Sequence, residues 1–397
     1  MGFKRILGLG GILLAGFFNS GCPIQEEKYD ENYALEYLHY GEDLEAKLSS
    51  ELSHNLDKEI NYKIFEIPIE GDKIKTAFIY NENVEKSEAV IIVPGFSAGG
   101  CLYLDYAKNL AKDYCVFIPD FKKDYLHFLG MEPTKDPLVS LKLDSLVKNI
   151  NSIVEEVKKI PGYENYGSFE DGMELFDKCM EGEIKDERVL EIVDDKLFSY
   201  REDGISSLMN YIYQVNETPG DFYHKVDFSK IGFEGHSLAG NEILKIVEER
   251  KYWWSDNVKA IISKGGTTNL QSLEKTNSIS KDVGVFFVQG IFDDDKSINS
   301  PAFERYKMLK GPSGYLEIEN AGHMFFIDFP IGYLCELLPF FGDASITPFD
   351  YFKNNEFNKE FSKTVYGAFL KNKKEDCNKL KSGDFEISGD YFVKNLN

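Results

Sequence analysis

The sequence predicts an α/β protein with a mostly parallel central sheet flanked by helices, and three observations lead to this fold class. Short, continuously apolar runs recur along the chain, as expected of strands that are buried on both faces. Segments with the apolar spacing of helices separate these runs, which is the alternation that gives parallel strands with right-handed crossovers. The chain has 397 residues, enough for one large α/β domain with an insertion.

The composition disfavours partners that are recognised through their phosphate groups. The chain carries 67 acidic and 45 basic residues, a formal net charge of −22. Phosphate binding needs clustered lysine and arginine, so we expect no nucleic-acid partner. The same charge argues against electrostatic docking on anionic lipid.

Residues 1–21 have the composition of a signal peptide. A basic start is followed by the apolar segment Ile6–Phe18, which is too short for a standard membrane span. Small residues then precede Cys22, which resembles the lipidation site of bacterial lipoproteins. We therefore expect an exported bacterial protein, membrane-anchored through a lipid on Cys22 at the periplasmic or cell-surface side. Asn19 departs from the pattern, so a plain secretory signal and an uncleaved anchor stay open as alternatives.

Residues 22–61 are polar with scattered leucines and predict an N-terminal linker with one or two helices. Tyr62–Ile69 and Lys73–Tyr80 alternate between apolar and polar residues around a glycine-containing turn, the pattern of an antiparallel hairpin. Ala89–Val93 and Cys115–Pro119 are continuously apolar and predict two buried strands, with an amphipathic helix between them.

Residues 121–226 are longer than a crossover between strands requires. We expect a helical insert here that includes the helix returning to the core. The expected helices are Leu143–Val157, Met173–Met180, Arg188–Leu197 and the returning helix around Ile205–Ile212. A helical cap over the end of the sheet that would carry a site is the preferred interpretation, and a packing embellishment at the side of the sheet is the alternative.

Apolar runs resume after the insert. The remaining predicted elements are strands at Val258–Ser263, Val283–Gly290 and Tyr315–Glu319, and a helix at Asn355–Leu370. The predicted core therefore comprises residues 62–120 and 227–370, and we expect residues 371–397 to form a loosely held polar tail.

The segment Lys230–Gly240 contains the most specific local signal. Its strand-like start stops at Gly235, a helical pattern begins at Leu238, and Ser237 lies between them. A serine on so abrupt a strand-to-helix turn indicates a nucleophile elbow, which admits only small side chains nearby, such as Gly235 and Ala239. The N–H of Leu238 at the start of the helix could stabilise a developing oxyanion.

A nucleophilic serine needs a base, and the chain has six histidines. His323 follows the last predicted strand on a loop that can return to Ser237, so it is the predicted base. His236 is adjacent to the serine, and we expect its side chain to project away from the hydroxyl and pack the elbow. The four others are expected to be structural: His39, His54, His127 and His224.

The acid that orients the base should follow the strand that ends at Gly290, where three aspartates occur in a row. Asp293 is preferred and Asp294 is the alternative, while a solvated acidic turn would be the non-catalytic interpretation. The alternating ligands and central glycine of a calcium loop are missing, so we expect no metal. The order Ser237, Asp293, His323 is that of α/β hydrolases.

An oxyanion hole needs a second backbone donor, placed after an early buried strand. Phe96 follows such a strand, and its N–H is assigned this role together with that of Leu238, with Ser97 as the neighbour to test. The glycine pair Gly99–Gly100 lacks a following Lys-Ser or Lys-Thr, which argues against a nucleotide site.

Three motifs carry a resemblance to a known family: Val93–Ala98, Val226–Gly240 and Ala321–Phe326. They resemble the dienelactone-hydrolase-like branch of α/β hydrolases, which includes esterases similar to platelet-activating-factor acetylhydrolase and polyester-cleaving enzymes. The similarity covers Tyr62–Asp120 and Arg201–Leu370.

This resemblance implies an α/β-hydrolase fold and a serine hydrolase that cleaves carboxylic esters through an acyl-enzyme on Ser237. It also implies a small-molecule or lipid ester as substrate and no cofactor. An acyltransferase or peptidase on the same triad, and a non-catalytic surface-binding lipoprotein, are the alternative functions.

Overall fold

The computed structural model describes residues 59–69, 72–95, 99–121, 143–180, 183–266, 278–291, 301–328, 348–385 and 391–396. The strands are β1 (Ile60–Ile69), β2 (Asp72–Asn81), β3 (Ser87–Val93), β4 (Cys115–Pro119), β5 (Val226–His236), β6 (Val258–Lys264), β7 (Gly284–Gly290), β8 (Ser313–Ile318) and β9 (Tyr391–Lys394). The α-helices are α4 (Leu104–Ala111), α6 (Leu143–Val157), α7 (Phe169–Met180), α8 (Glu187–Glu217), α9 (Leu238–Glu249), α10 (Pro301–Met308), α12 (Pro348–Phe369) and α13 (Lys374–Ser382). Short 3₁₀ helices are η1 (Gly100–Tyr103), η2 (Ser255–Asn257) and η4 (His323–Phe326).

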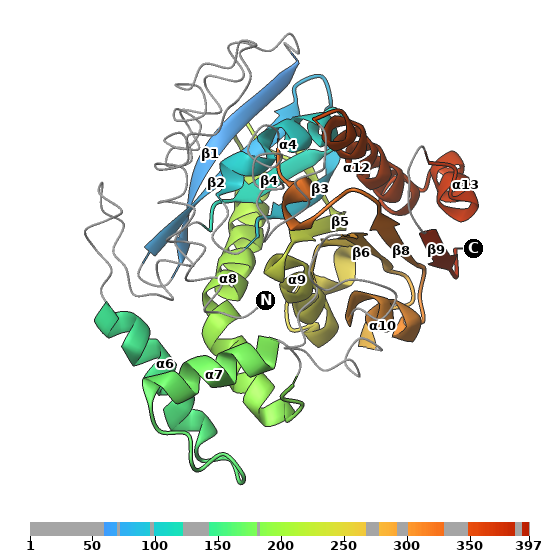
Figure 1. Ribbon diagram of the computed structural model, residues 1–397. Coiled ribbons are helices and arrows are strands. Elements are labelled where there is room, and N and C mark those ends of the chain that lie inside the picture. Colours follow the sequence, from blue (N-terminus) through green and yellow to red (C-terminus); the bar gives the residue numbers. More distant parts are fainter. Residues whose placement is uncertain are drawn as a thin grey trace, which may run out of the picture. The chain divides into compact units, whose positions relative to one another are not determined.

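Within these residues the strands form one mostly parallel sheet in the order β1-β2-β4-β3-β5-β6-β7-β8-β9 (Figure 1). The six consecutive strands β4, β3, β5, β6, β7 and β8 run parallel to one another. β1 and β2 form the predicted antiparallel hairpin, and β2 is antiparallel to β4. The α/β class with helices flanking a mostly parallel sheet is therefore confirmed.

The chain divides into two compact units. The smaller contains α6, α7 and the start of α8, and the larger contains the whole sheet. In the smaller unit α7 packs tightly on α6, because a Cβ added at Gly172 would lie 2.4 Å from Ile150 Cγ2. The expected role of the insert as a cap stays a prediction.

One helix replaces two that the sequence suggested. Arg188–Leu197 and Ile205–Ile212 belong to the single helix α8, which continues through Gly204. A glycine ordinarily weakens a helix interior, but here a Cβ would lie 2.4 Å from Ile74 Cδ1 on β2. The close approach of α8 to the sheet therefore explains why a glycine occupies this helix position.

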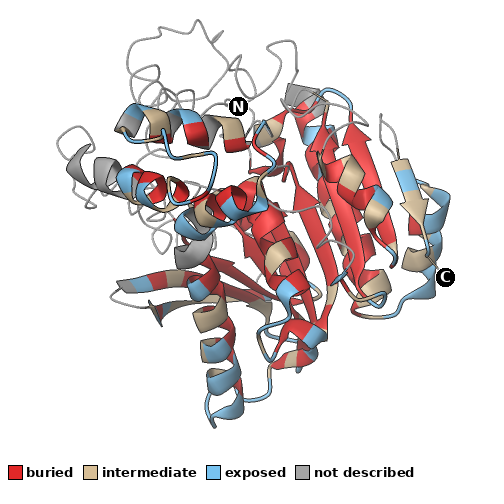
Figure 2. Ribbon diagram, turned by 90° about the horizontal axis from the view of Figure 1, so that it is seen from below, coloured by how far each residue is buried: buried red, intermediate tan, exposed pale blue. Residues whose placement is uncertain are grey.

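The core lies on both faces of the sheet, as the buried colouring of the parallel strands shows (Figure 2). Alternate residues of a strand point to opposite faces, so Val90 and Ile92 join the cluster under α4 and α12. Ile91 and Val93 join the other cluster, under α9 and the second part of α8. Because both faces of β3 are buried, its sequence contains a continuous apolar run.

The C-terminal segment differs from the expected polar tail. Within residues 371–397 the structure contains α13 and β9, and β9 pairs antiparallel with β8. The hydroxyl of Tyr391 donates to the carbonyl of Leu380 at 2.8 Å, and Leu380 is fully buried. Both elements are short, and α13 is mainly polar, so they are stabilised by this tertiary pairing and give little local signal.

The leader, with the proposed lipidation residue Cys22, lies outside the described residues. In the part of the chain that the structure describes, no helix combines the length and the apolar character needed to cross a membrane.

Candidate active site

The strand order reverses between β3 and β5, since the chain moves from β3 to β4 on one side and then to β5 on the other. In open α/β sheets, ligands bind outside the carboxyl ends of the strands at such a reversal. Val93 pairs with Gly235, so β3 and β5 end side by side. The residues that follow, Gly95 and Ser237, therefore lie at the position where the fold favours a site.

Ser237 occupies the turn between β5 and α9 in a conformation that few non-glycine residues adopt. Its φ is 58° and its ψ is −134°. The N–H of Ser237 donates to the carbonyl of Lys264 on β6 at 2.7 Å, and the N–H of Gly240 donates to the carbonyl of Ser237 at 2.9 Å. These hydrogen bonds hold the sharp turn from both sides.

The small residues around the serine are required by close packing. A Cβ added at Gly235 would lie 2.5 Å from the carbonyl oxygen of Ala239, and one added at Gly240 would lie 2.3 Å from Ser263 Oγ. Ala239 itself is fully buried. The prediction that this turn admits only small residues is confirmed, and the buried Ala239 fits it.

His323 reaches Ser237 from a strand that is not adjacent to β5. β8 lies three positions from β5 in the sheet, a separation of about 14 Å at the usual strand spacing. Residues 319–322 bridge this distance, and η4 begins at His323. His323 Nε2 lies 2.9 Å from Ser237 Oγ. The predicted nucleophile and the predicted base are therefore within hydrogen-bonding distance.

The segment that carries His323 is anchored to α4. The buried carboxylate of Asp328 accepts hydrogen bonds from the N–H groups of Asp105 at 2.8 Å and Tyr106 at 3.1 Å. Free N–H groups at a helix start need such acceptors. The Asp328 N–H donates to the carbonyl of Leu102 at 2.7 Å. Helix α4 thus fixes the C-terminal end of the histidine segment.

His236 makes polar contacts beyond the packing role expected from the sequence. Its Nδ1 lies 2.7 Å from the hydroxyl of Tyr103, and its Nε2 lies 2.8 Å from the carbonyl oxygen of His323. Burial lowers the pKa of the His236 imidazole well below its ordinary value, and repulsion from His323 and Lys264 adds to the shift. The ring is therefore neutral at physiological pH.

Arg201 is a buried residue near the site that the sequence analysis did not single out. This fully buried side chain on α8 pairs with Glu242 on α9, with Nε at 2.8 Å from Oε2. Its Nη2 donates to the carbonyl of Pro94 at 2.6 Å, just after β3. Arg201 precedes Ile205 by four residues, so it continues the apolar stripe of the helix. A charged residue on an inward stripe is the signal that could have indicated a buried partner.

A buried ion pair lies directly beside the elbow. Lys264 Nζ is 2.6 Å from Glu234 Oε1, and both side chains are almost fully enclosed. Burial lowers the pKa of Lys264, and its pairing with Glu234 opposes that shift. The hydroxyl of Tyr106 also donates to Glu234. This pair joins β5 to β6 immediately below the strained serine.

The other predicted site residues are placed only in part. Asp293, Asp294, Phe96 and Ser97 lie outside the described residues. Leu238 is the first residue of α9, so its N–H lies at a helix start, as expected. The described residues contain no group of three or more histidine, cysteine, aspartate or glutamate side chains placed to hold a metal ion.

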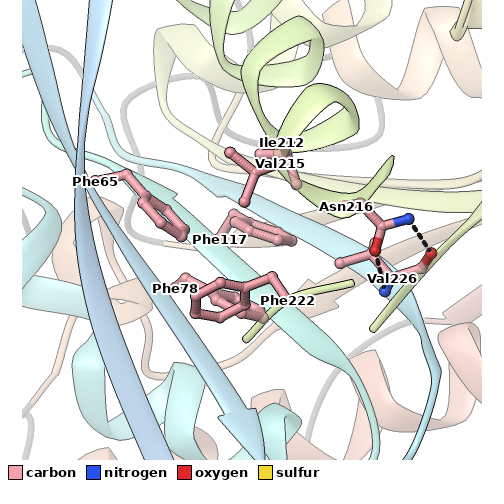
Figure 3. A pocket seen from close by; sticks show the side chains of 8 residues that line it. All are labelled: Phe65, Phe78, Phe117, Ile212, Val215, Asn216, Phe222 and Val226. Atoms are coloured by element: carbon pink, nitrogen blue, oxygen red, sulfur yellow. Dashed lines mark hydrogen bonds between the residues drawn. The ribbon is translucent and has the colours of Figure 1, made fainter. Parts of the chain in front are cut away.

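One small cavity lies in the core of the larger unit, and Ser237 is not among its lining residues (Figure 3). Its volume is about 10 Å³, which is the space of a single water. The lining residues are Phe65, Phe78, Phe117, Ile212, Val215, Asn216, Phe222 and Val226. Asn216, the polar member, is hydrogen-bonded to the backbone of Val226. The cavity is a packing gap and is too small for an organic ligand.

Fold and geometry together define a mostly parallel α/β protein with a serine–histidine pair at the carboxyl edge of its sheet. Comparison with known proteins adds no closer assignment, because no family model and no curated protein matches the chain.

Proposed function

We propose that this protein is a serine hydrolase that cleaves carboxylic esters through an acyl-enzyme on Ser237. The observation that carries the proposal is the 2.9 Å approach of His323 Nε2 to Ser237 Oγ. The strained backbone of Ser237 supports it, because strain of this kind is retained where it presents a nucleophile. A small-molecule or lipid ester is the proposed substrate.

The proposed reaction follows from these positions. Ser237 Oγ attacks the carbonyl carbon of the ester while His323 Nε2 takes the hydroxyl proton. The negative charge that forms on the carbonyl oxygen faces the N–H of Leu238 and, in our proposal, that of Phe96. The intermediate collapses, and the alcohol leaves with the proton from His323. Water then attacks the acyl-enzyme with His323 as base, which releases the acid and restores the serine.

The fold supports the same proposal without identifying a substrate. An α/β hydrolase carries its serine on a strand-to-helix turn at the edge of a mostly parallel sheet, with serine, acid and histidine in that chain order. Ser237 after β5 and His323 after β8 fit this arrangement. Asp293, with Asp294 as the alternative, is the proposed partner for His323 Nδ1. We also propose export and lipid anchoring through Cys22, on the sequence pattern alone.

The test is hydrolysis of p-nitrophenyl acetate by the purified protein. Ser237→Ala and His323→Ala should each lower kcat by about 10⁴-fold or more, since the members of such a triad act as a unit. Asp293→Asn should cause a comparable loss and Asp294→Asn should not, or the reverse if Asp294 is the acid. Ser229→Ala and His224→Asn are matched controls, because both residues are exposed and lie near or before the start of β5, whereas Ser237 follows the end of that strand.

Undiminished hydrolysis by Ser237→Ala would refute the proposal. A wild-type protein that neither hydrolyses the ester nor reacts with a fluorophosphonate probe would favour the non-catalytic alternative. Adding alcohol or amine acceptors and analysing the products separates hydrolysis from acyl transfer.

A further inference from the structure

A continuous chain of hydrogen bonds runs behind the serine from the end of β3 to the histidine segment. The N–H of Gly95 donates to the hydroxyl of Tyr103 at 3.1 Å. That hydroxyl lies 2.7 Å from His236 Nδ1, and His236 Nε2 lies 2.8 Å from the carbonyl oxygen of His323. Tyr103 and His236 are both almost fully buried. The ring of His236 also packs against Phe326, with centroids 5.6 Å apart.

The donors and acceptors in this chain fit only one protonation pattern. The carbonyl of His323 can only accept, so His236 Nε2 must carry the proton. A neutral imidazole has one N–H, so Nδ1 is an acceptor and the hydroxyl of Tyr103 donates to it. Burial raises the pKa of Tyr103, which keeps this hydroxyl protonated. The Tyr103 oxygen then accepts from Gly95, and all the polar groups of the chain are satisfied.

The hydrogen-bond chain ends at Gly95 on one side and at His323 on the other, and the proposed reaction depends on both ends. Gly95 directly precedes Phe96, the proposed oxyanion donor, and a Cβ at Gly95 would lie 3.3 Å from Ser237 Cβ. His323 is the proposed base. His236, in the middle, is covalently linked to Ser237. A shift of any link therefore moves Gly95 or the base relative to the nucleophile.

We propose that Tyr103 and His236 are positioning residues, which set the spacing of the Gly95 backbone and the base His323 around Ser237. The inference rests on the proposed function. The peptide that joins Pro94 to Gly95 shows the precision of the arrangement, because it is held at both its polar groups. Its carbonyl accepts from Arg201 at 2.6 Å, while its N–H donates to Tyr103.

The experiment compares Tyr103→Phe, His236→Ala, His236→Gln and the double variant Tyr103→Phe/His236→Ala. Each of the first two should lower kcat for p-nitrophenyl acetate by about 10- to 100-fold with little change in KM, because small displacements of reacting groups cost rates of this order. His236→Gln keeps an N–H that can reach the His323 carbonyl, so it should recover part of the loss. The double variant should be no slower than the worse single variant, since both changes break one chain.

Tyr315→Phe is the matched control. Tyr315 is equally buried and donates one hydrogen bond, to Glu317 at 2.8 Å, but it lies on β8 away from the serine. It should leave kcat unchanged. Ser237→Ala separates the two proposals: if it abolishes hydrolysis while Tyr103→Phe keeps kcat within about twofold, the inference is wrong and the proposed function stands. Losses that multiply in the double variant would also overturn it.

A spectroscopic measurement tests the hydrogen-bond chain without relying on esterase activity. In ¹⁵N-labelled wild-type protein the His236 imidazole should show a protonated Nε2 and an unprotonated Nδ1, and this pattern should persist at pH values about one unit below the ordinary histidine pKa. A protonated Nδ1 under these conditions would overturn the inference, whether or not any variant folds.

Discussion

Ser237 is the residue at which local backbone preference and fold most clearly disagree. A positive φ outside glycine usually costs on the order of 1–3 kcal/mol, and Ser237 adopts 58°. The hydrogen bond from its N–H to Lys264 and the one from Gly240 to its carbonyl offset that cost. The buried Glu234–Lys264 pair joins the same two strands just below. The conformation of one residue therefore depends on β6 and α9 as well as on its own turn.

At the residue scale, the neutral His236 predicts a loss of stability in acid. The unfolded chain takes up a proton on this histidine below about pH 6.5, whereas burial holds its folded pKa well below that value. The unfolded state then binds more protons, so the free energy of unfolding falls as pH decreases through this window, by up to about 1.4 kcal/mol per pH unit. Denaturant unfolding between neutral pH and about one unit below the histidine pKa measures this slope.

The comparison protein for that measurement is His236→Gln, which has no group that titrates in this range. The difference in unfolding free energy between wild type and variant should shrink as the pH falls. A difference that stays constant with pH would show that His236 titrates in the folded protein as it does in the unfolded chain, and a difference that grows as the pH falls would show that His236 is charged in the folded protein.

At the scale of elements, the contact between β5 and α9 predicts a strong effect of one methyl group. Gly235→Ala would place a Cβ 2.5 Å from a backbone carbonyl, which cannot rotate away as a side chain could. We expect unfolding to be easier by about 1–3 kcal/mol, as for other overpacked sites, together with slower labelling of Ser237 by a fluorophosphonate. Denaturant unfolding and labelling kinetics measure the two effects.

Gly220→Ala is the control for this change, because the nearest atom to an added Cβ there is 4.0 Å away. Equal stability of the two variants would show that the elbow can relax around the extra methyl group, and that Gly235 is not required by packing.

The elements that could be predicted from the sequence are those with a strong local pattern. β3, β4 and the elbow follow from continuous apolar runs and from a helix that starts directly after a serine. What could not be predicted depends on partners far away in the chain. Tyr103 and His236 are 133 residues apart, and Arg201 reaches Pro94 across 107 residues. No local pattern specifies such contacts, and β9 likewise exists because β8 offers it an edge.

At the scale of the whole molecule, the C-terminal strand completes the sheet. Phe392 on β9 contacts the rings of Phe303 and Tyr315, with centroids 5.6 Å and 6.4 Å apart. Deleting residues 391–397 removes these contacts and the pairing with β8, so we expect the free energy of unfolding to fall by about 2 kcal/mol. Denaturant unfolding measures this loss.

The deletion also leaves the edge of β8 unpaired, and an unpaired edge promotes association of chains. Light scattering should therefore rise with protein concentration. The point variant Phe392→Ala, which keeps the strand, should lose less stability and should not associate. Unchanged unfolding of the deleted protein would mean that β9 contributes nothing to the sheet.

The peptide between Pro94 and Gly95 is hydrogen-bonded to Arg201 through its carbonyl and to Tyr103 through its N–H. These two bonds bear on how the proposed site would bind a substrate. Contacts within the folded core fix the orientation of this peptide before any ligand binds. In the proposed reaction, no binding energy of the substrate is therefore needed to order this peptide. The peptide dipole also needs no reorganisation while charge develops on the substrate. On this side the proposed site would be preorganised, and any induced fit would have to come from elsewhere in the chain.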